Sequence, residues 1–199
     1  MRTASLIALT AVIAAYGASA TAGPLEDGEA AWSRGDYTTA RELLQPLADQ
    51  GVAQAEATLG VMYDNGQGVP RDDAAAVTWF RKAADQGHPH AEYDLALKYS
   101  EGRGVPRDDE AALSWFEKAA DHGDPEAMYR LGDAFEFGKG TAADYVRAYD
   151  WYDRAIDAFP LSWTVSRDRA VARRDAVVGK MWPGQLEQAQ LLALRRKQK

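Results

Sequence analysis

The sequence of 199 residues contains no cysteine. This absence excludes disulfide frameworks, thiolate nucleophiles, iron–sulfur clusters and zinc sites built on thiolates. It also excludes the cysteine that a bacterial lipoprotein carries directly after its leader peptide. We therefore expect the folded chain to be stabilised by packing alone.

Long apolar runs are also absent after the first twenty residues. Residues 6–15 form a short apolar stretch behind Arg2, and small residues continue up to Gly23. This order is typical of a secretory signal peptide, and the stretch is shorter than the ~20 residues that span a bilayer. We expect residues 1–22 to be removed, which leaves a periplasmic or secreted protein without a transmembrane segment.

Positive charge is scarce, with 23 Lys and Arg against 30 Asp and Glu and a net charge of −7. Such a balance argues against nucleic-acid binding through phosphate neutralisation. The deficit is uneven, because residues 161–199 carry nine cations against three carboxylates, a net +6, whereas residues 23–160 carry 13 against 27, a net −14.

Two interpretations of the basic tail remain open. Either it contacts an anionic envelope surface, or it folds back on the acidic body. The first interpretation assigns this contact to Arg167, Arg169, Arg173, Arg174, Arg195, Arg196 and Lys197.

Catalytic and metal-binding patterns are missing. His88 and His90 flank Pro89, and His122 precedes a glycine, which favours solvated turn histidines over a metal site. The mature chain contains none of the Ser-x-x-Lys, Gly-x-Ser-x-Gly and His-Glu-x-x-His motifs. The sequence therefore predicts no enzyme, no cofactor and no metal, and a hydrolase ranks third among the functions considered.

A 36-residue repeat dominates the rest of the chain. Leucines recur at 59, 95 and 131, tryptophans at 79, 115 and 151, and aspartates at 72, 108 and 144. The segment Gly66-x-Gly68-Val69-Pro70-Arg71-Asp72-Asp73 recurs almost unchanged 36 residues later. The units comprise residues 52–87, 88–123 and 124–159, and a degenerate unit at 23–51 precedes them.

Each unit has the periodicity of two antiparallel helices. Apolar residues recur at i, i+4, i+7 and i+8 in the first helix, and at i, i+3, i+4, i+7 and i+8 in the second. The paired glycines are expected to end the first helix, and Asp72 to cap the second. Small residues at Gly60, Ala96 and Gly132 should let neighbouring helices approach closely.

Residues 160–199 are predicted to form two further helices, from 162 to 179 and from 183 to 196, which cover the exposed end of the array. Val165, Ala172 and Ala176 give the first of these an apolar stripe. Leu186, Ala189 and Ala193 give the second its stripe.

The motif of Ala55, Leu59, Tyr63, Gly66-x-Gly68, Asp72, Trp79-Phe80 and Gly87 resembles Sel-like repeats, members of the tetratricopeptide superfamily, over about residues 25–160. The resemblance implies an all-α fold, a right-handed superhelical solenoid of antiparallel helix pairs. It also implies a protein-interaction scaffold without chemistry of its own, whose concave face holds a protein or peptide.

The first helix of each pair lines the concave face in such arrays. By register, this assigns partner binding to Asp64, His90, Tyr93, Leu97, Glu101, Glu126, Tyr129, Asp133 and Glu136. These residues are largely aromatic and acidic, which would suit a basic or apolar partner segment.

Overall fold

The structure, a computed structural model, describes residues 23–198, so the expected signal peptide lies outside the described residues. Within this range the chain forms ten helices and no strand, which confirms the all-α prediction. The chain divides into two compact units, one ending at Gln86 and the other beginning at Gly87. No helix between residues 23 and 198 is long and apolar enough to cross a membrane.

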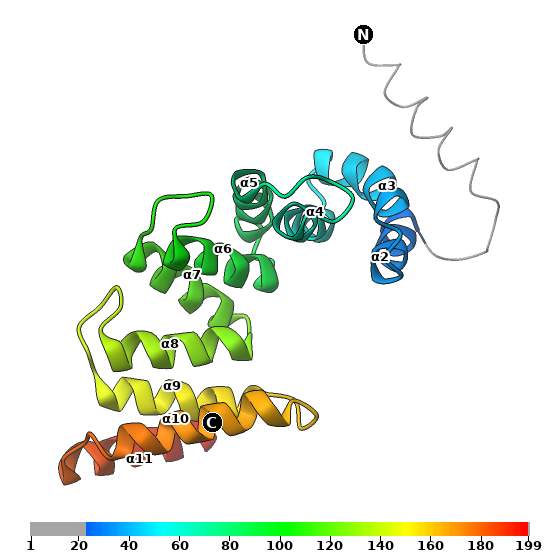
Figure 1. Cartoon of the computed structure of the whole chain (residues 1–199). Coiled ribbons are helices and arrows are strands. Elements are labelled where there is room, and N and C mark those ends of the chain that lie inside the picture. Colours follow the sequence, from blue (N-terminus) through cyan, green and yellow to red (C-terminus); the bar gives the residue numbers. More distant parts are fainter. Residues whose placement is uncertain (1–22, 199) are drawn as a thin grey trace. The chain divides into compact units, whose positions relative to one another are not determined.

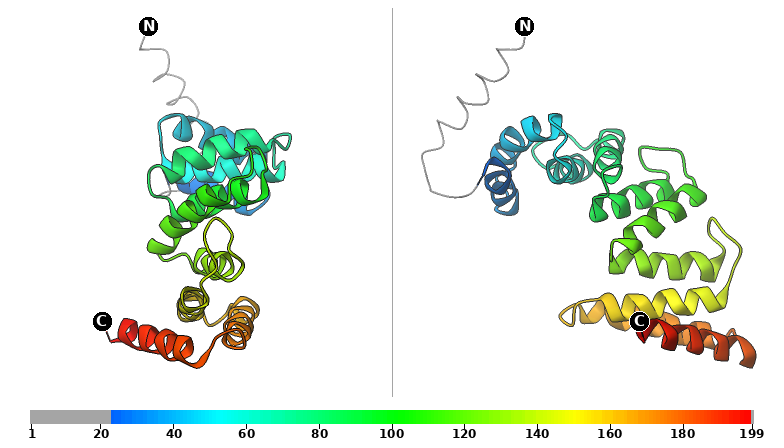
Figure 2. Two further views of the ribbon diagram at one scale, coloured as in Figure 1. Left: turned by 90° about the vertical axis from the view of Figure 1, so that its left-hand side faces the viewer. Right: turned by 180° about the vertical axis from the view of Figure 1, so that it is seen from behind.

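The helices follow one another as hairpins (Figure 1). The first unit contains α2 (Pro24–Ser33), α3 (Tyr37–Asp49), α4 (Ala53–Asn65) and α5 (Asp73–Ala84). The second contains α6 (Pro89–Glu101), α7 (Asp109–Asp121), α8 (Pro125–Phe137), α9 (Tyr145–Ala158), α10 (Thr164–Val178) and α11 (Pro183–Lys197). Helices α2 to α9 pair in sequence order, and α10 and α11 both pack against α9 (Figure 2).

The helix ends form at the residues that the sequence predicts. Asp72 Oδ1 accepts hydrogen bonds from the backbone N–H groups of Ala74 and Ala75, at 2.9 and 3.0 Å, and so satisfies two donors at the start of α5. Asp108 and Asp144 cap α7 and α9 in the same way. Gly66 ends α4 with φ +69°, a left-handed conformation that residues with a side chain rarely adopt.

The repeated apolar positions form the core of each unit. Leu59, Leu95 and Leu131 are completely buried. A Cβ atom at Gly132 would collide with the ring of Tyr152, which confirms that a small residue permits the close approach of α8 and α9. The hairpin packing therefore depends on where the smallest side chains stand as much as on the large ones.

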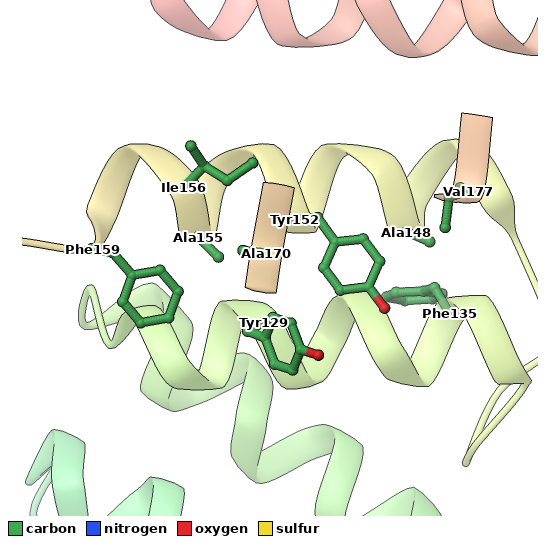
Figure 3. Close-up of a cluster of buried hydrophobic side chains, with 9 residues drawn as sticks. All are labelled: Tyr129, Phe135, Ala148, Tyr152, Ala155, Ile156, Phe159, Ala170 and Val177. Carbon is green, nitrogen blue, oxygen red and sulfur yellow. The ribbon is translucent and has the colours of Figure 1, made fainter. Parts of the chain in front are cut away.

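The last apolar cluster joins α8, α9 and α10. Tyr129 and Phe135 of α8 face Tyr152 of α9, and Ala170 and Val177 of α10 lie against the same cluster (Figure 3). The rings of Tyr129 and Tyr152 are tilted by 53° with centroids 5.5 Å apart, an arrangement that aromatic pairs favour. Helix α10 thus completes the core of the last repeat.

The predicted apolar stripe of α10 is wrong. Val165 is 82% exposed, and Ala172 and Ala176 also face solvent, whereas Ala170 and Val177 are fully buried. Helix α10 instead packs against α8 and α9 with the face that carries Ala170 and Val177, seven residues apart, and its arginines reach carboxylates of the same two helices. For α11 the stripe is correct, because Ala189 and Ala193 are buried and Leu186 is partly buried.

Candidate partner-binding site

A pocket of about 270 Å³ lies between α6, α7 and α8 of the second unit. Apolar side chains from all three helices line it: Leu97, Ala112, Leu113, Phe116 and Ala134. Phe116 follows the recurring Trp115, and it is 94% buried while also lining the pocket. The repeat architecture therefore leaves a pocket here that apolar side chains of three helices help to line.

Charged side chains line the pocket as well. Arg107, Arg130 and Lys139 contribute three cations, and Glu101, Asp109 and Asp133 contribute three carboxylates. Arg107 donates two hydrogen bonds to Asp109, Nε to Oδ1 at 3.0 Å and Nη2 to Oδ2 at 2.9 Å. This bidentate geometry holds the guanidinium in one orientation.

The pocket unites three residues that the sequence predicts for partner binding: Leu97, Glu101 and Asp133. Tyr93 is placed beside them, since its ring lies 5.8 Å from that of Phe116. Burial raises the pKa of Tyr93 above its ordinary value, so the phenol stays neutral. Repeat register does not find Arg107 and Lys139 because they lie in the loops before α7 and after α8, where helix periodicity places no residue. Arg130 lies within α8 but outside the positions that register assigns to the concave face.

The other predicted residues lie elsewhere. Asp64 belongs to the last turn of α4 in the first unit. His90 is exposed, with Nδ1 3.4 Å from Asp124 Oδ2. Glu126 bonds with Arg169 of α10 at 2.7 Å, and the guanidinium of Arg169 lies 4.2 Å above the ring of Tyr129.

Glu136 is bound within the fold. It accepts hydrogen bonds from Arg173 Nη2 at 2.6 Å, Lys180 Nζ at 2.8 Å and the hydroxyl of Tyr152 at 2.8 Å. Its side chain is only 1% exposed. A partner segment could reach this carboxylate only by displacing α10.

Most of the predicted anionic-surface cations also make contacts within the second unit. Arg174 bonds with Asp153, while Arg196 and Lys197 bond with Asp153 and Asp157 of α9. Arg169 and Arg173 pair with α8, as described above. Arg167 and Arg195 have no ion pair with any residue in the described part of the chain. The tail thus folds back on the acidic body through five of its seven named cations.

His90 is exposed, as the sequence suggested, but His88 and His122 are more than solvated turn residues. His88 Nδ1 accepts a hydrogen bond from the backbone N–H of Ala91 at 3.3 Å and caps α6. His122 Nδ1 lies 2.7 Å from Glu92 Oε2, a carboxylate that is 2% exposed. Among residues 23–198, no three histidine or carboxylate side chains are arranged to hold a metal ion.

His88 makes the stability of the second unit depend on pH. Burial and the neighbouring His90 lower its pKa below the ordinary value, against the opposing charge of Glu92. The unfolded chain therefore protonates the His88 imidazole at a higher pH than the folded chain does. The contribution of neutral His88 to the free energy of unfolding is fully present above about pH 6.5 and falls as the pH drops below it. The variant His88→Asn keeps a capping acceptor that does not titrate. We therefore expect its free energy of unfolding, measured by urea denaturation, to change less between about pH 7.5 and 5 than that of the wild type.

Comparing the wild type with His88→Asn isolates the effect of His88, because both proteins contain the other titratable groups near it. The charges that act on His88 are those of His90 and Glu92 on α6, while His122 lies beside the neighbouring Gly87 and Asp124 beside His90. Parallel stability curves for the wild type and the variant would contradict the expectation.

Comparison with known proteins identifies the repeats. A family model for the Sel1 repeat matches residues 23–52, 53–88, 89–124 and 125–158. No curated protein matches the chain significantly. The chain is similar to the crystal structure of a Sel1 repeat protein from Oxalobacter formigenes, with 29% identity and a TM-score of 0.70 over 77% of this chain and 59% of that chain.

It is also similar to c5321, a protective antigen of uropathogenic Escherichia coli strains with an SLR fold. The identity is 32% and the TM-score 0.69, over 79% of this chain and 32% of that chain. The chain thus spans less than two thirds of the length of either relative. Because the four repeat matches cover more than half of the chain, and the helix hairpins match those of these structures, this protein belongs to the Sel1 repeat family.

Proposed function

We propose that this protein is an exported scaffold that holds a segment of a partner protein in the pocket between α6, α7 and α8. Sel1 repeat proteins generally act as protein–protein interaction scaffolds. The observation that supports the proposal here is the pocket itself, which is lined by both apolar and charged side chains.

The size of the pocket favours a side chain over a cofactor. Its 270 Å³ lies just below the ~300–1,000 Å³ that is usual for small-molecule sites. One or two apolar side chains of a peptide would fill it, and an anchor of this kind contributes most of the affinity in many interfaces. We therefore infer an apolar anchor residue in the partner.

The charges around the pocket refine the chemistry of the partner. With three cations and three carboxylates, the pocket has no excess of either sign. This differs from the acidic surface that the sequence suggested, because Glu126 and Glu136 are bound to α10 instead. An apolar anchor flanked by charged residues of both signs fits this arrangement better than a uniformly basic segment does.

A random peptide library displayed on phage and selected on the purified protein tests the proposal. For the peptides obtained, we expect Leu97→Lys to weaken binding at least about tenfold, because it places a charge among the apolar side chains that line the pocket. Glu101→Lys should change the sequence preference beside the anchor. Fluorescence polarisation with labelled peptides measures both effects.

Asp121→Lys provides the matched control. Asp121 is an exposed carboxylate at the end of α7, outside the pocket, so its reversal alters the net charge as Glu101→Lys does. Circular dichroism shows whether each variant is folded. If Leu97→Lys and Asp121→Lys bind the selected peptides with the affinity of the wild type, the pocket is not the binding site.

Export rests on the sequence of residues 1–22, with its early cation, apolar stretch and small residues. The mass of the protein recovered from a bacterial periplasm or culture medium tests this part. A chain that begins at Gly23 supports export, and a full-length chain confined to the cytoplasm contradicts it.

A further inference from the structure

The last helix presents an unusual outer face. Helix α11 packs against α9 with the small side chains Ala189 and Ala193, and it lies at the end of the second unit (Figure 2). Its large apolar side chains point away from this contact, since Leu191 is 46% and Leu194 57% exposed. Exposed leucines on one helix face offer apolar surface to a second molecule.

The spacing of this outer face matches a helix-pairing seam. Glu187, Leu191 and Arg195 follow one another at intervals of four residues. This spacing places them along one ridge of the helix, opposite the buried Ala189 and Ala193, and such ridges pack into the grooves of another helix. We call these three residues the α11 seam.

Charge complementarity specifies the occupant of the seam. Glu187 lies four residues before Leu191, and Arg195 lies four residues after it. Both are exposed, and neither pairs with another residue of the described chain. Arg196 and Lys197, in contrast, are bound to the carboxylates of α9.

We propose that α11 pairs in antiparallel orientation with α11 of a second copy of this chain, about a two-fold axis at Leu191. In this arrangement Leu191 meets its own counterpart, and Glu187 of each copy faces Arg195 of the other. The two ion pairs form simultaneously because a two-fold contact repeats every interaction. The seam is thus complementary to itself, as such an interface requires.

The dimer is weak. A helix of 15 residues is about 22 Å long, so one helix pair buries less than the ~1,200–2,000 Å² of a standard stable interface. We expect a dissociation constant on the order of 10–100 μM. Weak pairing would double the number of partner pockets in one assembly, which increases avidity for a multivalent partner.

Sedimentation equilibrium of the mature chain, from about 5 μM to 1 mM, tests the proposal. We expect the average mass to rise from monomer to dimer across this range. Glu187→Arg and Arg195→Glu alone should each weaken association about tenfold, because two attractive pairs become repulsive. The double variant Glu187→Arg/Arg195→Glu should restore wild-type association, since the pairs form again with reversed sign.

Two leucine variants locate the surface. Leu191→Glu should abolish dimerisation, whereas Leu192→Glu, at a similarly exposed leucine outside the seam, should leave it unchanged. Wild-type protein that stays monomeric up to 1 mM, or a dimer indifferent to the charge reversals, overturns the proposal. The proposal is also overturned if monomeric wild-type protein sediments with phosphatidylglycerol vesicles and Leu191→Glu abolishes this binding, because the seam would then be a lipid-binding face.

Discussion

Arg173→Met is expected to lower the free energy of unfolding of the second unit by about 3 kcal/mol. Arg173 Nη2 donates to Glu136, a carboxylate with only 1% of its side chain exposed. Removing one partner of such a pair leaves a charge poorly compensated in the interior, which usually costs about 3–5 kcal/mol. We expect the lower end because Lys180 still contacts Glu136 and Arg173 is itself 31% exposed.

Tyr152 cannot replace the lost cation. Its hydroxyl lies 2.8 Å from Glu136 and 2.7 Å from Asp133, but a phenol has one hydrogen to donate. Burial, and then the charge of Asp133, raise the pKa of Tyr152 far above its usual range, so the hydroxyl remains a neutral donor. Glu136 therefore depends on the cations that α10 and the following turn supply.

Urea denaturation of the variant measures the loss, and Arg169→Met is its matched control. Arg169 also pairs with a carboxylate of α8, but both partners are partly exposed, so its removal should cost no more than about 1 kcal/mol. The variant Arg173→Met/Glu136→Gln should recover part of the stability because no buried charge remains. Equal effects of Arg173→Met and Arg169→Met would show that Glu136 does not need its cation.

Deleting residues 160–199 is expected to unfold α8 and α9 while the first unit stays folded. The deletion exposes the cluster that Ala170 and Val177 complete (Figure 3). It also removes the cations bound to Glu136, Asp150 and Asp153, which leaves an acidic surface without compensation. Because repeat arrays are stabilised by contacts between neighbours, the loss should concentrate in the last repeat.

Hydrogen exchange resolved by helix measures this effect. We expect amides of α8 and α9 to lose protection in the truncated protein and those of α2 to α5 to keep it, because α2 to α5 form their own unit. A shorter deletion of residues 182–199 removes α11 and keeps Ala170 and Val177, so it should have a smaller effect. Retained protection of α8 and α9 without residues 160–199 would show that α10 is dispensable for folding.

Much of the fold could be predicted from the repeat. The 36-residue register places Leu59, Leu95 and Leu131 in the core, and it places Asp72 at a helix start. Such positions are predictable because helix periodicity and capping depend on residues close together in the sequence. The family follows from the same register.

The candidate site was only partly predictable. Leu97, Glu101 and Asp133 were found by register, but Arg107, Arg130 and Lys139 were not. Register shows which face of a helix a residue occupies, and it cannot show whether a later segment covers that face. Helix α10 covers Tyr129 and Glu136, and no local pattern in α8 indicates that.

The sequence by itself determined the helix pairs, their caps and the uneven charge of the chain. Only the tertiary structure decided what that charge does: the cations of α10 and α11 bond with the carboxylates of α8 and α9, so Glu126 and Glu136 of the expected acidic groove are bound within the fold. The physical reason is the distance along the sequence over which each interaction acts. Caps and periodicity act within a few residues, whereas the pairing of Arg173 with Glu136, 37 residues apart, depends on how completed helices pack.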